Sequence, residues 1–275
     1  MRLARQTAAA AGVTATVVVT EGAGHARELA AAAVAGGARL VIAWGGDGTI
    51  SEVAAALIGG DVTLGIVPAG SGNGLARELG IARRPASAIA DAVRATPSTI
   101  DVGDINGHYF VNTAGIGFDA HVASRFATAS RRGFLGYVNI TARALASYVP
   151  LEYRISVDDG PVETVRAILV TIANSAQFGN GARIAPGARV DDGELDLVTF
   201  EERSRFKTVC ALPRLFTGSA DRIAGCRLTR LRTVTVEGDA PLTYHLDGEP
   251  VVGGTTLRAR VHPAALRVAV ARNYS

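Results

Sequence analysis

The sequence predicts two domains: an α/β domain with a parallel sheet, followed by a β-rich domain that forms a sandwich. In the first hundred residues, short apolar runs alternate with alanine-rich helical stretches and are separated by glycine loops, which is typical of a parallel sheet. Beyond residue 100, strand-like runs predominate and are separated by Asp-Gly and Asn-Gly turns. The 275 residues are 48% hydrophobic and 19% charged, a globular composition that suits one large domain or two ordinary ones.

The first domain is assigned to residues 1–100. Its strands are expected where β-branched and apolar residues run together, and its helices where alanine predominates until a glycine pair ends the pattern. Pro85 fits the first turn of the last of these helices. In order, we expect a helix at Met1–Ala11, a strand at Val13–Thr20, a helix at His25–Ala35, a strand at Leu40–Trp44 with Trp44 in the core, a helix at Thr49–Ile58, a strand at Leu64–Val67, and helices at Leu75–Leu79 and Pro85–Ala95.

The second domain is assigned to residues 101–275, and its last strand is free to return to the first domain. Asn106-Gly107 between two apolar runs predicts a hairpin of Asp101–Ile105 and His108–Thr113. The remaining elements follow the same patterns of apolar runs and turn residues. They are helices at Ala120–Thr128 and Tyr137–Tyr148, and strands at Glu152–Val157, Val165–Ile172, Glu194–Phe200, Arg230–Val236, Leu242–Leu246, Thr256–Val261 and Leu266–Val270.

Charge and composition exclude several classes of protein. The 28 Lys+Arg against 25 Asp+Glu leave a formal charge of +3, which is too small to indicate a nucleic-acid partner. Cys210 and Cys226 lack the spacing of a zinc site or a disulfide framework, so a reducing, cytoplasmic setting is expected. No apolar stretch is long enough to predict a membrane-spanning helix. The single lysine, Lys207, follows no glycine-rich loop, so the Walker A pattern is absent.

The segment Leu40–Glu52 carries the first chemical signal. A buried strand runs into Gly45, Gly46, Asp47, Gly48 and Thr49 and then directly into a helix. Glycines allow a ligand to approach the main chain, and the N–H groups at the helix start favour phosphate. Thr49 and Glu52 have the spacing of a capping box at that start. Asp47 suits a metal ion held between a carboxylate and nucleotide phosphates.

The segment Gly65–Leu79 repeats this arrangement of strand, glycine loop and helix. Its loop contains Ser71, Gly72 and Asn73, which offer a hydroxyl, a close main-chain approach and an amide to a nucleotide. The carboxyl ends of neighbouring parallel strands meet at one edge of a sheet, where α/β proteins bind ligands. Two such loops about 20 residues apart therefore predict a nucleotide site more specifically than either does alone.

These two loops, G-G-D-G-T and P-A-G-S-G-N-G-L-A-R-E-L, resemble the diacylglycerol kinase catalytic-domain family, which includes bacterial lipid kinases and sphingosine kinases. Further matching segments follow in the order of the family, at Asn112–Ala120, Ala173–Phe200 and Tyr244–Pro250. The family's first strand and its Asn-Pro-x-Ser-Gly loop are not found in this sequence, which leaves open whether they precede its first residue or are missing from the protein. Gly74 makes the second loop closer to the sphingosine kinase branch.

The resemblance implies an α/β domain like that of NAD kinase and diacylglycerol kinase, with a β-sandwich for the lipid. It implies an ATP- and Mg²⁺-dependent lipid kinase that phosphorylates the hydroxyl of a diacylglycerol- or sphingosine-like lipid. ATP would be bound by nine residues of the first domain, and His25 stands where the family usually has Asp. The nine are Thr20, Gly45, Gly46, Asp47, Gly48, Thr49, Ser71, Gly72 and Asn73.

The resemblance also implies a metal site and an acid–base site in the second domain. A structural Mg²⁺ would be held by the carboxylate of Asp192 and the main-chain carbonyls of Arg189 and Glu194. Without the resemblance, this Asp-Asp-Gly segment reads as an ordinary β-turn. Asp247 and Glu249 would take the proton of the lipid hydroxyl as it attacks the γ-phosphate, and the sequence does not choose between them.

Two alternatives remain open at this point. An NAD kinase-like enzyme shares the Gly-Gly-Asp-Gly-Thr loop, although its second loop has a different Asn-Gly pattern. The second alternative is a nucleotide- or lipid-binding module without enzymatic activity. On the leading hypothesis the partner is a lipid alcohol, the protein works at the surface of the inner membrane leaflet, and a homodimer is one of the oligomeric states left open.

Overall fold

The structure, a computed structural model, describes residues 1–118, 120, 148–179, 181–201 and 213–270. The helices expected at Ala120–Thr128 and Tyr137–Tyr148 lie outside the described residues, apart from one terminal residue of each. The chain divides into two compact units. One comprises Met1–Asp101 and the chain from Ala264 onward, and the other comprises Val102–Pro263.

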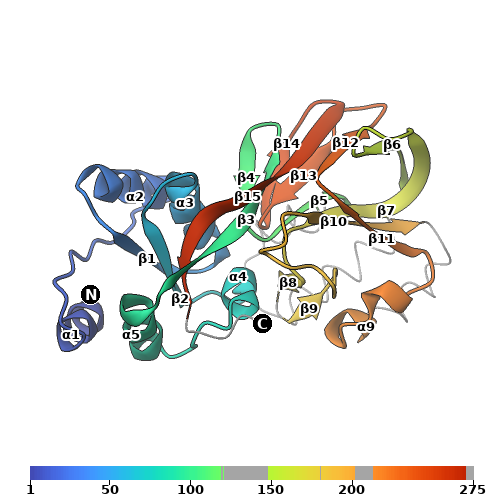
Figure 1. Ribbon diagram of the computed structural model, residues 1–275. Helices are drawn as coiled ribbons and strands as arrows, with labels where there is room; N and C mark the ends of the chain where they lie inside the picture. Colours follow the sequence, from blue (N-terminus) through green and yellow to red (C-terminus); the bar gives the residue numbers. More distant parts are fainter. Residues whose placement is uncertain (119, 121–147, 180, 202–212, 271–275) are drawn as a thin grey trace. The chain divides into compact units, whose positions relative to one another are not determined.

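The first unit is an α/β unit with parallel pairing at its centre. β1 and β2 pair in parallel along their whole length, and the end of β15 (Thr256–Ala269) pairs in parallel with β2 through Val268 and Leu64. Helices α2 and α3 lie on one face of this sheet, and α1 and α5 lie on the other (Figure 1). The elements are α1 (Arg2–Ala10), α2 (His25–Ala35), β1 (Leu40–Gly45), α3 (Asp47–Leu57), β2 (Thr63–Pro68), α4 (Gly74–Glu78) and α5 (Pro85–Arg94).

Apolar spacing explains how these helices pack. Buried side chains of α3 recur at Ile50, Val53, Ala54 and Leu57, the spacing of one helix face. On the other side of the sheet, Ala88 and Ile89 of α5 pack with Val67 of β2 in one apolar cluster. The alternation of strand and helix predicted from the sequence is therefore confirmed, with element ends shifted by one or two residues.

The strand predicted at Val13–Thr20 is wrong. These residues have no regular secondary structure, and Val18 and Val19 are 58% and 62% exposed. A strand needs a hydrogen-bonded neighbour, and in the described part of the chain β1 pairs with β2 alone. Trp44 was expected in the core, but it is 40% exposed because β1 lies at the edge of the sheet.

The second unit is β-rich and antiparallel. The hairpin of β3 (Pro97–Ile105) and β4 (His108–Phe110) turns at Asn106 and Gly107, whose φ angles of 51° and 87° are those of the predicted Asn-Gly turn. The remaining elements are β5 (Thr113–Gly117), β6 (Leu151–Val157), β7 (Glu163–Ala173), β8 (Gln177–Gly179), β9 (Ala182–Arg183), β10 (Leu195–Glu201), α9 (Pro213–Phe216), η1 (Ala220–Arg222), β11 (Cys226–Leu231), β12 (Thr233–Glu237), β13 (Thr243–Leu246) and β14 (Glu249–Val252). Two strands contain residues of both units, β3 (Pro97–Ile105) and β15 (Thr256–Ala269).

The long strand β7 organises this unit. It pairs with β6 over its first half, with β5 over its second half, and with β10 along its other edge. The side chains between these strands form one apolar core, in which Phe110, Tyr153, Ile172, Leu197 and Leu257 are at most 4% exposed. The predicted β-rich second domain is confirmed.

Several strand boundaries differ from the prediction. The strand predicted at His108–Thr113 ends at Phe110, and Thr113 begins β5. The run Arg230–Val236 is divided at Arg232 into β11, which pairs with β10, and β12, which pairs with β6 and β15. Asp158 fixes this division, because its Oδ1 accepts the N–H groups of Arg232 at 2.9 Å and Thr233 at 2.8 Å. By contrast, the strands predicted at Thr256–Val261 and Leu266–Val270 form the single strand β15.

β15 continues through a bend at Ala264. This residue has a φ of 51°, and its N–H donates to Asp101 Oδ1 at 2.7 Å. Among the described residues, no helix has the length and apolarity needed to cross a membrane.

Candidate functional site

The first glycine loop joins β1 to α3 and closely approaches the second. A Cβ atom on Gly70 would lie 2.7 Å from the Cα of Gly46, and one on Gly45 would lie 2.6 Å from the side chain of Thr49. A larger residue at position 70 would force the main chains of the two loops apart, and one at position 45 would displace the side chain of Thr49. The N–H of Ala69 donates to the carbonyl of Gly45 at 2.8 Å. The structure thus brings together the two glycine loops predicted from the sequence.

Asp47 ties the two loops together. Its Oδ2 accepts the N–H of Asn73 at 2.8 Å, and its Oδ1 accepts the N–H of Gly74 at 2.7 Å. Both donors lie at the start of α4, so the carboxylate satisfies N–H groups that the helix leaves free. Gly72 packs against this carboxylate, since a Cβ there would lie 2.7 Å from Oδ2. In the structure, Asp47 therefore positions the second loop.

Asn73 also bonds within its own loop. Its Nδ2 donates to the carbonyl of Gly70 at 2.7 Å, and its Oδ1 accepts the N–H of Gly70 at 2.9 Å. Its φ of 50° is in the left-handed region that asparagine tolerates. Ser71 is exposed, whereas Gly48 and Thr49 are half-buried at the start of α3.

The capping box predicted at Thr49 and Glu52 is wrong. Helix α3 begins after Gly46 without a side-chain cap. The carboxylate of Glu52 instead accepts the N–H of Gly24 at 2.7 Å and of Ala26 at 3.1 Å, at the start of α2. Glu52 thereby fixes the loop that follows Thr20. Thr20 itself is exposed. The residues of the predicted nucleotide site thus all lie in the first unit, and the sequence offered no signal for this role of Glu52.

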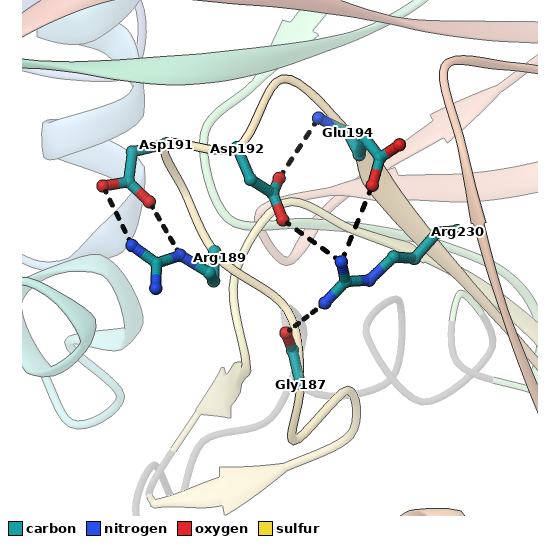
Figure 2. A network of polar contacts seen from close by, with 6 residues as sticks. All are labelled: Gly187, Arg189, Asp191, Asp192, Glu194 and Arg230. Atoms are coloured by element: carbon teal, nitrogen blue, oxygen red, sulfur yellow. Dashed lines mark hydrogen bonds and ion pairs between the residues drawn. The ribbon is translucent and has the colours of Figure 1, made fainter. Parts of the chain in front are cut away.

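The predicted metal residues lie on the turn before β10 (Figure 2). Asp192 Oδ1 accepts the N–H of Glu194 at 3.2 Å. The guanidinium of Arg230 lies 4.0 Å from Asp192 Oδ2 and 3.7 Å from Glu194 Oε2, and it donates to the carbonyl of Gly187 at 3.4 Å. The side chain of Arg189 turns to Asp191, with Nε 3.2 Å from Oδ1.

Burial raises the pKa of the neighbouring carboxyl group of Asp196 to about 6. The negative charges of Asp192 and Glu194 raise this pKa further, while Arg230 opposes the shift. Three carboxylates thus share one nearby arginine, and this part of the turn favours a positive charge.

A divalent cation fits this turn. Asp192 Oδ2 is buried and accepts no hydrogen bond within the described residues. Buried polar atoms normally have a partner, and carboxylate oxygens are the ligands that Mg²⁺ prefers. The described residues contain no cluster of three or more His, Cys, Asp or Glu side chains suited to a metal. A cation here would therefore need main-chain oxygens as well.

Asp247 and Glu249 share the turn between β13 and β14. Asp247 has a φ of 50° and Gly248 a φ of 93°, a two-residue hairpin in which Leu246 pairs with Glu249. Glu249 is exposed, whereas Asp247 is half-buried. The oxygens of Asp247 accept the N–H groups of Val111, Asn112 and Thr113, at 3.0, 2.8 and 3.1 Å.

Asn112, Asn174 and Ser175 form a buried polar network at the main-chain segment that donates to Asp247. The sequence predicted no role for these three residues. Asn174 and Ser175 are fully buried and Asn112 is 8% exposed. All three belong to segments on which the resemblance rests. The sequence signal for this network was that the three polar residues interrupt otherwise apolar runs.

Comparison with known proteins identifies related families. The diacylglycerol kinase catalytic domain matches residues 1–105, and the YegS C-terminal NAD kinase beta sandwich-like domain matches residues 112–270. A Mycobacterium tuberculosis protein named diacylglycerol kinase is 36% identical over 192 residues, which are 66% of this chain and 61% of that protein. A Chromohalobacter salexigens protein named lipid kinase YegS-like is 31% identical over 205 residues, 74% of this chain and 65% of that protein. The chain thus spans less than two thirds of the length of these relatives.

Solved structures share the fold. The crystal structure of a diacylglycerol kinase from Bacillus anthracis has a TM-score of 0.74 at 20% identity, covering 97% of this chain and 88% of that one. A second structure from the same organism has a TM-score of 0.82 at 23% identity, with coverage of 97% and 87%. At these identities the structural likeness concerns the fold.

Proposed function

The chain belongs to the diacylglycerol kinase catalytic-domain family, and on that premise we propose that it is an ATP- and Mg²⁺-dependent lipid kinase. It transfers the γ-phosphate to the hydroxyl of a diacylglycerol- or sphingosine-like lipid. The observation that carries the proposal is the pairing of two glycine loops at the carboxyl ends of β1 and β2, joined through Asp47. This edge of a parallel sheet is where α/β proteins bind nucleotides.

The first unit supplies the ATP site. The N–H groups at the start of α3, an eleven-residue helix, favour phosphate oxygens through their partial positive charge. Gly45, Gly46 and Gly48 allow those oxygens to approach the main chain. Ser71 offers an exposed hydroxyl from the second loop, and Thr20 offers another from the loop that Glu52 holds.

The second unit supplies the acid–base group. A lipid hydroxyl is a weak nucleophile at neutral pH, and a carboxylate that accepts its proton accelerates attack by roughly 10²–10⁴-fold. Asp247 or Glu249 takes this proton. When bound, Mg²⁺ offsets charge on the phosphoryl oxygens, and Asp192 with the carbonyls of Arg189 and Glu194 holds a structural ion.

The lipid acceptor implies where the enzyme works. A long-chain alcohol presents its hydroxyl at the boundary between membrane and water, so the protein binds peripherally at the cytoplasmic face of the membrane. Its partners are then the lipid and the bilayer surface, and it has no nucleic-acid partner.

The test is transfer of labelled phosphate from ATP, with Mg²⁺, to lipid alcohols in mixed micelles. Diacylglycerol and sphingosine are the acceptors, and NAD is the control acceptor. We expect Asp247→Asn to lower kcat by roughly 10²–10⁴-fold because the proton acceptor is lost, while ATP binding is retained. Asp239→Asn serves as a matched control, since Asp239 is an exposed carboxylate of the same unit.

Each alternative has its own result. Transfer to NAD in place of lipid would replace the proposal with an NAD kinase-like activity. ATP binding without transfer to any acceptor would indicate a binding module. An Asp247→Asn variant as active as the wild type would remove Asp247 from the chemistry and leave Glu249 as the candidate base.

A further inference from the structure

The segment Val111–Thr113, which connects β4 to β5, surrounds the carboxylate of Asp247 with N–H groups. Three successive N–H groups of this segment donate to the carboxylate, and the N–H of Asp247 donates back to the carbonyl of Thr113 at 2.8 Å. The direction of the carboxylate therefore depends on where these N–H groups point.

Asn174 holds the opposite side of the same segment. Its Nδ2 donates to the carbonyl of Val111 at 2.9 Å, and its main-chain N–H donates to the carbonyl of Asn112 at 2.9 Å. The three N–H groups of the segment are thus held by Asp247, and the carbonyl groups of Val111 and Asn112 are held by Asn174. Because Asn174 is fully buried, water does not compete for these bonds.

The side chain of Asn112 completes the link to the chain after β7. Its Nδ2 donates to the carbonyl of Gln177 at 2.9 Å, and its Oδ1 accepts the hydroxyl of Ser175. Asn112 and Ser175 therefore keep the central residue of the segment against the strand end that carries Asn174.

An apolar core would stabilise this region without so many polar groups, which need complete pairing when buried. What a network of buried hydrogen bonds adds is direction. We infer that Asn174, supported by Asn112 and Ser175, is a positioning residue that orients the carboxylate of Asp247 through the N–H groups of Val111–Thr113. This inference rests on the proposed function, because it assigns Asn174 to the turn that carries the acid–base site.

The test compares Asn174→Ala with wild type in the lipid kinase assay and in amide hydrogen exchange. We expect kcat to fall at least tenfold with KM for ATP changed less than twofold, because ATP binding uses the first unit. Exchange of the peptide that contains residues 111–113 should rise. Thr199→Val is the matched control, since Thr199 is a buried polar residue of β10 in the same unit and should leave both readouts near wild type.

A double-mutant cycle separates positioning from general loss of structure. If Asn174 acts through Asp247, adding Asn174→Ala to Asp247→Asn should lower kcat less than twofold further. Fully additive losses would overturn the inference, as would unchanged exchange at residues 111–113. Should Asn174→Ala not fold, Ser175→Ala weakens the same network, and unchanged kcat and exchange in that variant would count equally against it.

The proposed function and the positioning role fail in different ways. If the wild type phosphorylates no lipid, the proposed function fails. Exchange at residues 111–113 in Asn174→Ala and Asp247→Asn still shows whether Asn174 and Asp247 act on the same segment: equal increases support the structural link, and an increase in Asp247→Asn alone overturns it.

Discussion

Four carboxylates, on Asp47, Glu52, Asp158 and Asp247, each hold a distant stretch of main chain. Each accepts two or three N–H groups from residues between 26 and 136 positions away in the sequence. Such bonds are charge-assisted, so they are stronger than bonds between neutral groups. Sequence reasoning gave Asp47 a ligand-binding role, Glu52 a capping role and Asp247 an acid–base role. It missed the main-chain contacts because the donors are N–H groups that no side-chain pattern reveals.

Asp196 should make stability depend on pH. Its folded-state pKa of about 6 lies above the value of about 3.9 for an exposed Asp, so the folded protein binds the extra proton between these pH values. Stability contributed by the neutral carboxyl is present below about pH 4 and is lost as the pH rises through 6. We expect Asp196→Asn to be more stable than wild type by up to about 3 kcal/mol at pH 8, with no difference near pH 4.

Urea unfolding at pH 4, 6 and 8, in EDTA so that no cation binds nearby, measures this effect. Asp239→Asn is the control, because that carboxylate is exposed. Parallel stability curves for wild type and Asp196→Asn would contradict the prediction.

At the scale of elements, the availability of a neighbouring strand decided which apolar runs became strands. Val13–Thr20 has the composition of a strand but pairs with no strand of the described residues. Arg230–Val236 is divided because its two halves pair with different strands. The Asn106-Gly107 hairpin, in contrast, depends on local chain geometry alone, and its prediction was confirmed.

The contact between the two glycine loops gives a prediction at this scale. In Gly70→Ala, the new Cβ would lie 2.7 Å from the main chain of Gly46, which has no flexible side chain to move. The loops must separate, at a cost of about 1–3 kcal/mol for overpacking. We expect stability to fall by that amount and ATP affinity to fall about tenfold, as measured by thermal unfolding and calorimetric titration.

Gly254→Ala is the matched control for this substitution, since a Cβ there meets nothing within 4 Å. ATP affinity in Gly70→Ala equal to that of the control would show that the loops do not form the nucleotide site together.

At the scale of the whole molecule, the chain forms two compact units, and the candidate cation turn belongs to the second. If Asp192 holds Mg²⁺ only in the folded state, the ion should stabilise the protein by about 2.7 kcal/mol at a hundredfold excess over its Kd. We expect Mg²⁺ without ATP to raise the Tm, and Asp192→Asn to abolish the increase. An equal increase in wild type and Asp192→Asn would place the ion elsewhere.

The sequence by itself determined the alternation of strand and helix from Leu40 to Arg94, the two glycine loops, the β-rich second half and the family. These follow from local patterns, namely apolar periodicity, glycines that tolerate close approach, and turn residues such as Asn106-Gly107. Motifs in a fixed order along the chain were enough to identify the family, because each motif is contiguous.

Only the tertiary structure decided which strands pair, which carboxylate holds which segment, and which polar residues lie behind the Asp247 turn. Asn174 and Val111 are 63 residues apart, and Asp247 and Val111 are 136 apart. Hydrogen bonds over such separations depend on how β4, β5, β7 and β13 come together in one unit. That arrangement results from burial of the shared apolar core, which local sequence patterns do not specify.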